Sequence, residues 1–193
     1  MWRSLAASIA LSLALAACDG GPKFRNIDIT GADYAKGFAL TDHNGKPRTL
    51  GDFRGKVVVV FFGFTRCPDV CPTTLSELKG VMQKLGPDAD KVQVLFVTLD
   101  PERDSAKVLA QYVPAFDPRF LGLYGDADTT PKTAKEFKIF YEKRAGSSPE
   151  SYTIDHSAAS YAFDQEGRLR LFVKHDQLGT LVDDIRTLLK ERG

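Results

Sequence analysis

The chain has 193 residues, of which 43% are hydrophobic and 26% are charged, close to the average of soluble globular proteins. These proportions exclude a disordered chain, a collagen and a polytopic membrane protein. The formal net charge is only +1, so the chain offers no strongly positive field and we expect no nucleic-acid partner. A chain of this length folds without disulfide bridges, so we expect its three cysteines to serve chemistry or processing.

Residues 1–17 have the pattern of a bacterial secretory signal. Arg3 precedes an apolar run from Leu5 to Ala17, which is too short to cross a bilayer as a helix. Small residues lead into Cys18, so we predict a lipoprotein signal peptide over residues 1–17 and lipid attachment to the Cys18 thiol. The alternative is an ordinary secretory cleavage site that happens to precede a cysteine.

A lipid on Cys18 predicts a soluble domain that is anchored to a membrane. Residues 18–31 show little pattern and are expected to form a flexible tether, followed by one folded domain over residues 32–193. Asp19 resembles the inner-membrane retention signal of enteric lipoproteins. The expected location is therefore the periplasmic side of the inner membrane, where disulfides are permitted.

The folded domain alternates the patterns of strands and helices. Asn44-Gly45 predicts a hairpin turn, and the β-branched and aromatic run Val57–Phe62 predicts a central strand buried on both faces. The predicted strands are Phe38–Thr41, Arg48–Leu50, Val57–Phe62, Val92–Leu99, Phe120–Tyr124, Ser157–Phe163 and Leu169–Val173. The predicted helices are Pro72–Leu85, one capped by Asp104, one starting at Thr129 or Thr130, and one with apolar residues from Leu178 to Leu189.

This order of elements predicts the fold class. Parallel strands joined by crossover helices alternate through the centre, and an antiparallel hairpin forms the edge before the last helix. We therefore expect an α/β fold, a thioredoxin-like three-layer domain with a mixed central sheet and an added N-terminal β-hairpin. The polar stretch Ala145–Tyr152 is expected to be a loop.

Cys67 and Cys71 follow the predicted central strand and lead into the first helix, and active sites of open α/β sheets gather at such strand ends. Pro72 disfavours a helical conformation of the residue before it, which predicts Cys71 at the helix N-cap. The positive end of the helix and nearby Arg66 both favour thiolate over thiol. The pair is therefore expected to be redox-active or metal-binding rather than inert.

The C-x3-C spacing leaves two forms of chemistry open. The two sulfurs can form a disulfide, or they can point at one metal ion. Two cysteines cannot build the four-cysteine cage of a structural zinc site, so a third ligand would have to be histidine. Sulfur with one imidazole suits Cu(I), and the same set can hold Cu(II).

The chain has three histidines. His43 lies in the predicted hairpin turn and is expected to be solvated, and His175 is expected at the surface or at the start of a helix. His156 follows the polar loop at the start of a strand that lies beside the cysteine loop in a thioredoxin-like topology. It is therefore a candidate ligand, with a structural histidine as the alternative, and Asp155 is a candidate to orient its ring or to hold a nearby amide.

Three segments, Phe62–Thr74, Asp100–Asp104 and Asp155–Ser157, together resemble the Sco/SenC family of copper-binding thioredoxin-like proteins. The resemblance covers residues 28–192. It implies that Cys67, Cys71 and His156 bind one copper ion as Cu(I) or Cu(II). Many members of the family use a transmembrane helix as anchor, whereas this chain is expected to use a lipid.

The resemblance also implies a function and partners. The protein would deliver copper to the dinuclear copper site of cytochrome c oxidase, or maintain the cysteines of that site. The oxidase copper-site subunit and other periplasmic copper chaperones are the expected partners. The alternative is a copper-independent thiol-disulfide oxidoreductase that uses Cys67 and Cys71.

Two further aspartates are candidates for supporting roles. Asp69 lies between the cysteines and is interpreted as a loop residue, with an axial approach to the metal or an ion pair with Arg66 as alternatives. Asp100 is interpreted as part of an Asp-Pro turn, with positioning of the cysteine loop as the alternative.

Overall fold

The computed structural model describes residues 22–148 and 151–191. The predicted signal peptide, Cys18 and the first residues of the tether lie outside these ranges. The strands are β1 Ile27–Asp28, β2 Ala39–Asp42, β3 Pro47–Thr49, β4 Val57–Gly63, β5 Val92–Thr98, β6 Leu121–Tyr124, β7 Tyr141–Arg144, β8 Thr153–His156, β9 Ala159–Phe163 and β10 Leu169–Lys174. The helices are α1 Val70–Leu85, α2 Ala106–Tyr112, α3 Thr129–Glu136 and α4 Leu181–Lys190, with short 3₁₀ turns at Leu50–Phe53, Gly86–Lys91 and His175–Thr180.

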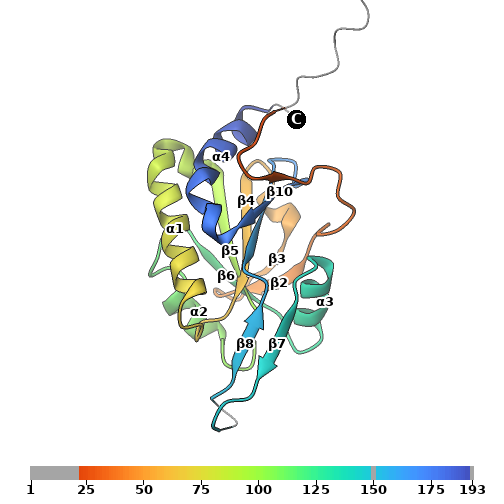
Figure 1. The fold of residues 1–193 in the computed structure, drawn as a ribbon, viewed down its shortest axis with the longest axis vertical. Coiled ribbons are helices and arrows are strands. Elements are labelled where there is room, and N and C mark those ends of the chain that lie inside the picture. Colours follow the sequence, from red (N-terminus) through yellow and green to blue (C-terminus); the bar gives the residue numbers. More distant parts are fainter. Residues whose placement is uncertain (1–21, 149–150, 192–193) are drawn as a thin grey trace, which may run out of the picture.

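A mixed sheet in the order β1-β10-β9-β4-β5-β6-β2-β3 forms the middle layer. Helices α1 and α4 cover one face and α3 lies on the other, while β7 and β8 pair separately and project from one end (Figure 1). The predicted three-layer, thioredoxin-like fold with its N-terminal hairpin is confirmed.

The centre of the sheet is the parallel pair β4 and β5, in which every residue is buried. Each face of the sheet has its own hydrophobic core, and alternate side chains of β4 point into one or the other. Val57, Val59 and Phe61 pack toward α1 and α4, whereas Val58, Val60 and Phe62 pack with the α3 side. Burial on both faces explains the uninterrupted apolar run, and it fixes the end of β4, from which the cysteine loop departs.

Two predicted helix starts are wrong by one or two residues. Helix α1 begins at Val70, so Cys71 lies in its first turn and not at the N-cap, which is Asp69. A proline is tolerated in the first turn because the amides there have no partner within the helix. Helix α2 is capped by Ser105, which accepts from the Val108 amide, and not by Asp104, whose carboxylate points into the protein.

Part of the predicted tether is bound to the folded domain. The amides of Arg25 and Asn26 donate to the two carboxylate oxygens of Asp184 on α4, at 2.6 and 2.9 Å. Strand β1 then pairs antiparallel with β10. The described part of residues 18–31 is therefore docked on the domain from Arg25 onward.

The edge of the sheet corrects the interpretation of His43. Its Nδ1 accepts from the Gly122 amide at 3.0 Å, and its own amide donates to the Gly122 carbonyl. Strand β2 pairs with β6 immediately before this point. His43 thus continues a strand pairing that the local sequence does not reveal.

The β7–β8 hairpin was not predicted, although its connection coincides with the expected polar loop. Its register pairs Tyr141 with His156 and Arg144 with Thr153. Residues 149–150 of the loop lie outside the described ranges. Among the helices of the described residues, none combines the length and the hydropathy that a membrane span needs.

Candidate metal centre

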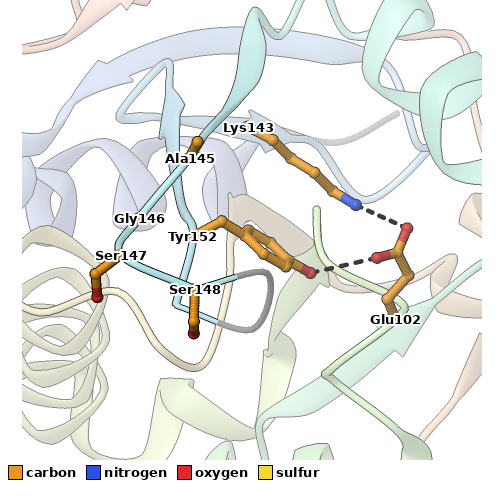
Figure 2. Close-up of a pocket in the computed structure, with 7 residues that line it drawn as sticks. All are labelled: Glu102, Lys143, Ala145, Gly146, Ser147, Ser148 and Tyr152. Atoms are coloured by element: carbon orange, nitrogen blue, oxygen red, sulfur yellow. Dashed lines mark hydrogen bonds and ion pairs between the residues drawn. The ribbon is translucent and has the colours of Figure 1, made fainter.

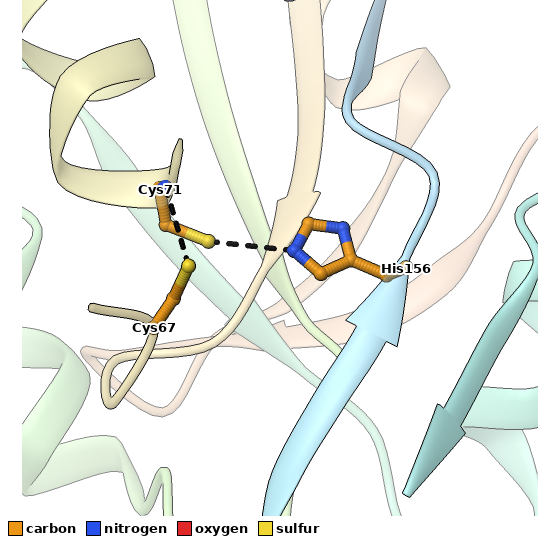
Figure 3. A group of neighbouring side chains, drawn as sticks. All are labelled: Cys67, Cys71 and His156. Atoms are coloured by element: carbon orange, nitrogen blue, oxygen red, sulfur yellow. Dashed lines mark hydrogen bonds between the residues drawn. The ribbon is translucent and has the colours of Figure 1, made fainter. Parts of the chain in front are cut away.

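Three side chains from separate parts of the fold meet beyond the end of β4. Cys67 lies in the loop after β4, Cys71 in the first turn of α1, and His156 at the last position of β8 (Figure 3). Their two sulfurs and one ring nitrogen all lie within 4.8 Å of one another. The fold therefore brings the C-x3-C pair together with His156, the histidine predicted as a candidate ligand.

The distances suit a small soft metal ion. The Cys71 sulfur lies 3.6 Å from Nε2 of His156, and the Cys71 amide donates to the Cys67 sulfur at 3.4 Å. Sulfur and nitrogen ligands bind at about 2.3 and 2.0 Å in zinc sites, which leaves three ligands in a plane roughly 4 Å apart. Small side-chain movements would thus place all three donors around one ion.

Gly63, which has no side chain, leaves room for the buried Cys71 sulfur. A Cβ on Gly63, the last residue of β4, would lie 2.8 Å from the Cys71 sulfur and 2.9 Å from the Phe96 ring. Such distances are shorter than van der Waals contact, so glycine is the residue that this close approach permits. The rings of Phe61 and Phe64 flank the His156 ring, with centroids 6.4 and 5.9 Å away.

The two thiols have opposite acid–base character. The hydrogen bond from Cys71, together with amide donors of the loop, lowers the pKa of Cys67 to about 5. The same hydrogen bond and burial raise the pKa of Cys71 above its ordinary value. Cys67 is therefore a thiolate at neutral pH, and Cys71 keeps its proton until metal binding or disulfide formation releases it.

The burial of the three side chains is unequal. Cys71 is 0% exposed, whereas Cys67 and His156 are each half-buried. The site is thus closed toward the core and accessible from the side of Cys67 and His156. A ligand from another molecule can reach an ion here without unfolding the core.

Asp104 holds the start of the cysteine loop. Its buried carboxylate accepts hydrogen bonds from the amide and hydroxyl of Thr65 and from the hydroxyl of Thr98. These contacts tie the segment after β4 to the segment after β5. The sequence around Asp104 predicted a helix cap, because the residues that it holds, Thr65 and Thr98, are not its neighbours along the chain.

The His156 ring is oriented by a carbonyl and not by Asp155. Its Nδ1 lies 3.0 Å from the Ser157 carbonyl oxygen. A proton on Nδ1 donates to that oxygen and leaves the Nε2 lone pair directed at the sulfurs. The Asp155 carboxylate accepts instead from Arg144 at 2.8 Å and so joins β8 to β7.

The other two aspartates have different surroundings. Asp69 is exposed, and its carboxylate accepts from the Thr73 hydroxyl at 3.4 Å. Asp100 is 0% exposed and accepts from Tyr152 and Arg103. Asp100 therefore contacts the hairpin that carries His156, whereas Asp104 contacts the cysteine loop.

Comparison with known families agrees with this site. The sequence profile described as SCO1/SenC matches residues 28–190. The chain belongs to the SCO1/SenC family. The family resemblance that the motifs indicated is thereby confirmed.

Relatives of this SCO1/SenC protein include bacterial and mitochondrial chains. It is 37% identical to the copper-bound structure of Bradyrhizobium japonicum ScoI, with a TM-score of 0.73, covering 79% of this chain and 98% of that one. It is 40% identical to apo Sco1 of Thermus thermophilus, with a TM-score of 0.77, covering 89% and 100%. A mouse mitochondrial SCO2 homologue is 42% identical over 132 residues, which are 67% of this chain and 52% of that protein. The chain thus spans about half the length of this curated relative.

Proposed function

We propose that this SCO1/SenC protein is a metallochaperone that binds one copper ion through Cys67, Cys71 and His156. It delivers that ion to the dinuclear copper site of cytochrome c oxidase, or maintains the cysteines of that site. The observation that carries the proposal is the convergence of two sulfurs and one imidazole nitrogen within 4.8 Å.

The donor set fits copper as cargo. Thiolates are soft ligands that favour Cu(I), and imidazole binds both oxidation states of copper. Three ligands leave room for a fourth, which a target protein supplies during ligand exchange. Because Cys67 and His156 are half-buried and Cys71 is buried, the first two are placed to release the ion before Cys71.

Similarity to copper-bound ScoI of B. japonicum supports the proposal. The oxidase copper-site subunit is the proposed recipient, and other periplasmic copper chaperones are the proposed donors. Their support is the family resemblance of the three sequence motifs.

Anaerobic copper titration of the reduced chain tests the ligand set. The Cys18→Ser background leaves Cys67 and Cys71 as the remaining thiols. We expect one bound ion per chain and a thiolate-to-Cu(II) absorption band that weakens and shifts in Cys67→Ser and in Cys71→Ser, because each variant keeps only one thiolate. His156→Ala should weaken Cu(II) binding at least tenfold, a loss of about 1.4 kcal/mol or more.

His175 offers a matched control. It is an exposed histidine at the start of a 3₁₀ turn, so His175→Ala should keep the wild-type affinity and spectrum. A reduced chain with no bound copper and no absorption band would end the metallochaperone proposal.

The acidic Cys67 thiol favours a second function, thiol-disulfide exchange without copper. The Cys67 thiolate attacks a target disulfide and releases one target thiolate. Cys71 then loses its proton and displaces the second target thiolate, so the target gains two electrons and a Cys67–Cys71 bond forms. This disulfide removes both sulfur ligands, so the two functions exclude each other at any one moment. Turnover of a target disulfide by the copper-free chain tests it, and no turnover would remove it.

The proposed location is the periplasmic side of the inner membrane, with a lipid on Cys18 as the anchor. The support is the sequence of residues 1–19.

A further inference from the structure

We propose that Tyr152 is a positioning residue that holds strand β8 so that His156 faces the cysteine pair. The proposal rests on the proposed role of His156 as a copper ligand. It adds a residue that touches neither the sulfurs nor the ion and acts through the placement of one ligand.

Tyr152 is held by several contacts to the segment that follows β5. Its hydroxyl donates to the Asp100 carboxylate at 2.6 Å, and its ring lies 3.5 Å from the Arg103 guanidinium. Its carbonyl accepts from Arg103 at 2.8 Å. Burial and the Asp100 hydrogen bond raise the pKa of Tyr152, so the hydroxyl remains a donor at neutral pH.

The outer side of the Tyr152 ring borders a hollow of about 550 Å³. Lys143 and Glu102 form an ion pair across its rim, and Glu102 also accepts from the Tyr152 hydroxyl at 3.4 Å (Figure 2). The Lys143 and Glu102 side chains are both exposed, and exposed ion pairs contribute little. The part-buried hydrogen bonds to Asp100 and Arg103 therefore account for the attachment.

The attachment point is hydrogen-bonded to the residues that also hold the cysteine loop. The Asp100 amide donates to the Thr98 hydroxyl, which itself donates to Asp104. Asp104 in turn holds Thr65 at the start of the cysteine loop. One short segment after β5 thus contacts both halves of the metal centre.

The strand transmits this placement to His156. Tyr152, Ile154 and His156 alternate with exposed residues and therefore share the inward face of the strand. Ile154 is buried in the core between them. Because β8 pairs only with β7 among the described residues, and an isolated two-stranded hairpin is marginally stable, contacts to the body must fix its position.

A double-mutant cycle on Cu(II) binding tests the proposal in the Cys18→Ser background. Tyr152→Phe removes the hydroxyl but keeps the ring under Arg103, whereas Tyr152→Leu removes both contacts. We expect Tyr152→Leu to raise the Cu(II) Kd at least tenfold, with Tyr152→Phe intermediate. Nitrogen coupling in the EPR spectrum should weaken, and the β8 amides of the metal-free chain should exchange faster.

The cycle separates positioning from general loosening. In the His156→Ala background, Tyr152→Leu should change the Kd less than twofold, since no imidazole remains to be placed. Tyr34 is the matched control, because its ring also lies near a cation, Lys138, at 4.1 Å. Tyr34→Leu should leave Kd, nitrogen coupling and β8 exchange unchanged.

Each other result has a defined meaning. If Tyr152→Leu raises the Cu(II) Kd by the same factor in the wild-type and His156→Ala backgrounds, the positioning role would be overturned. Such a result would indicate a general loosening of the fold. If Tyr152→Leu leaves the Cu(II) Kd unchanged while His156→Ala raises it, the positioning role would be overturned and the proposed ligands would stand. If His156→Ala binds Cu(II) with the wild-type Kd, the proposed ligand set itself would be overturned. If Tyr152→Leu does not fold, the same cycle with Tyr152→Phe decides between these results.

Discussion

Cys67 and Cys71 are chemically unlike although one turn of chain separates them. The sequence predicted thiolate character from the helix dipole and Arg66. In the structure the main cause is the hydrogen bond from Cys71, with loop amides and His156 contributing to the low pKa of Cys67. A buried proton donor beside a half-exposed thiolate is a pair prepared both for metal binding and for nucleophilic attack.

This asymmetry predicts a pH profile for alkylation of the metal-free chain in the Cys18→Ser background. The rate of Cys67 modification by iodoacetamide should stay flat above neutrality and fall by half near the pKa of about 5, because the thiolate is the nucleophile. Cys71→Ala removes the hydrogen-bond donor and should move the midpoint toward about 8.5, the ordinary cysteine value. An unchanged midpoint in Cys71→Ala would assign the low pKa to the loop amides and the helix instead.

Gly63 predicts a second effect at the scale of one residue. An added Cβ would meet the Cys71 sulfur at 2.8 Å, so Gly63→Ala should displace that ligand and overpack the core, at a cost of about 1–3 kcal/mol. Copper affinity should fall at least tenfold. Chemical denaturation and copper titration measure the two effects.

Gly80 provides the control for Gly63. It lies within α1, and a Cβ there would meet nothing within 4 Å. Gly80→Ala should stabilise the fold by about 0.5–1 kcal/mol and leave copper affinity unchanged. A Gly63→Ala protein that binds copper like the wild type would show that Cys71 has room to shift.

At the scale of elements, the segment between β5 and α2 contacts both parts of the candidate metal centre. Asp104 holds the cysteine loop, and Asp100 with Arg103 holds the hairpin that carries His156. The sequence predicted the strand and the helix on either side of this segment. It did not reveal the β7–β8 hairpin, whose exposed, charged strand Tyr141–Arg144 lacks the apolar alternation by which strands are recognised.

Asp104 predicts a stability effect at this scale. Asp104→Ala leaves the buried Thr98 hydroxyl and the part-buried Thr65 donors without their acceptor, and each orphaned buried donor costs about 1–3 kcal/mol. We expect a loss of about 3 kcal/mol or more. Asp104→Asn should cost less because the amide keeps one acceptor oxygen and the Thr65 hydroxyl can rotate to accept.

The pH dependence of the Asp104→Asn effect has a defined sign. Burial raises the pKa of Asp104 above 3.8 in the folded chain. Because the folded chain binds this proton more tightly than the unfolded chain, protonation of Asp104 adds to the unfolding free energy. This contribution is fully present below pH 3.8 and is lost as the pH rises through the raised pKa. The difference in unfolding free energy between wild type and Asp104→Asn should therefore be larger in acid than at pH 7. A difference that grows toward pH 7 would contradict the burial argument.

At the scale of the whole molecule, the docked N-terminal segment sets how the domain relates to its proposed anchor. Strand β1 lies near the upper end in Figure 1, and the β7–β8 hairpin projects from the lower end. The chain from Cys18 to Arg25 reaches at most about 25 Å when fully extended. A lipid on Cys18 would therefore keep Arg25, and with it the β1 end of the domain, within about 25 Å of the bilayer.

Lipid anchoring makes a direct prediction in a bacterial host. The wild-type chain should partition with the membrane fraction and enter the detergent phase, whereas Cys18→Ser should be soluble. Cys71→Ser is the control, because it removes a thiol from the domain and should remain in the membrane fraction. Mass spectrometry of the N-terminal peptide should show acyl groups on Cys18. A wild-type chain found in the soluble fraction would refute the anchor.

The alternation of strands and helices, the three-layer class, the C-x3-C pair at the end of the central strand and the family could all be predicted from the amino-acid sequence. These follow from local periodicity and from motifs whose residues are neighbours along the chain. The folded structure was needed to show that the His156 ring, 85 residues from Cys71, lies next to the Cys71 sulfur, that Asp104 holds the cysteine loop, and that Arg25 docks on α4. The reason is physical: contacts between distant segments are selected by the burial and packing of the whole core, which no local pattern encodes.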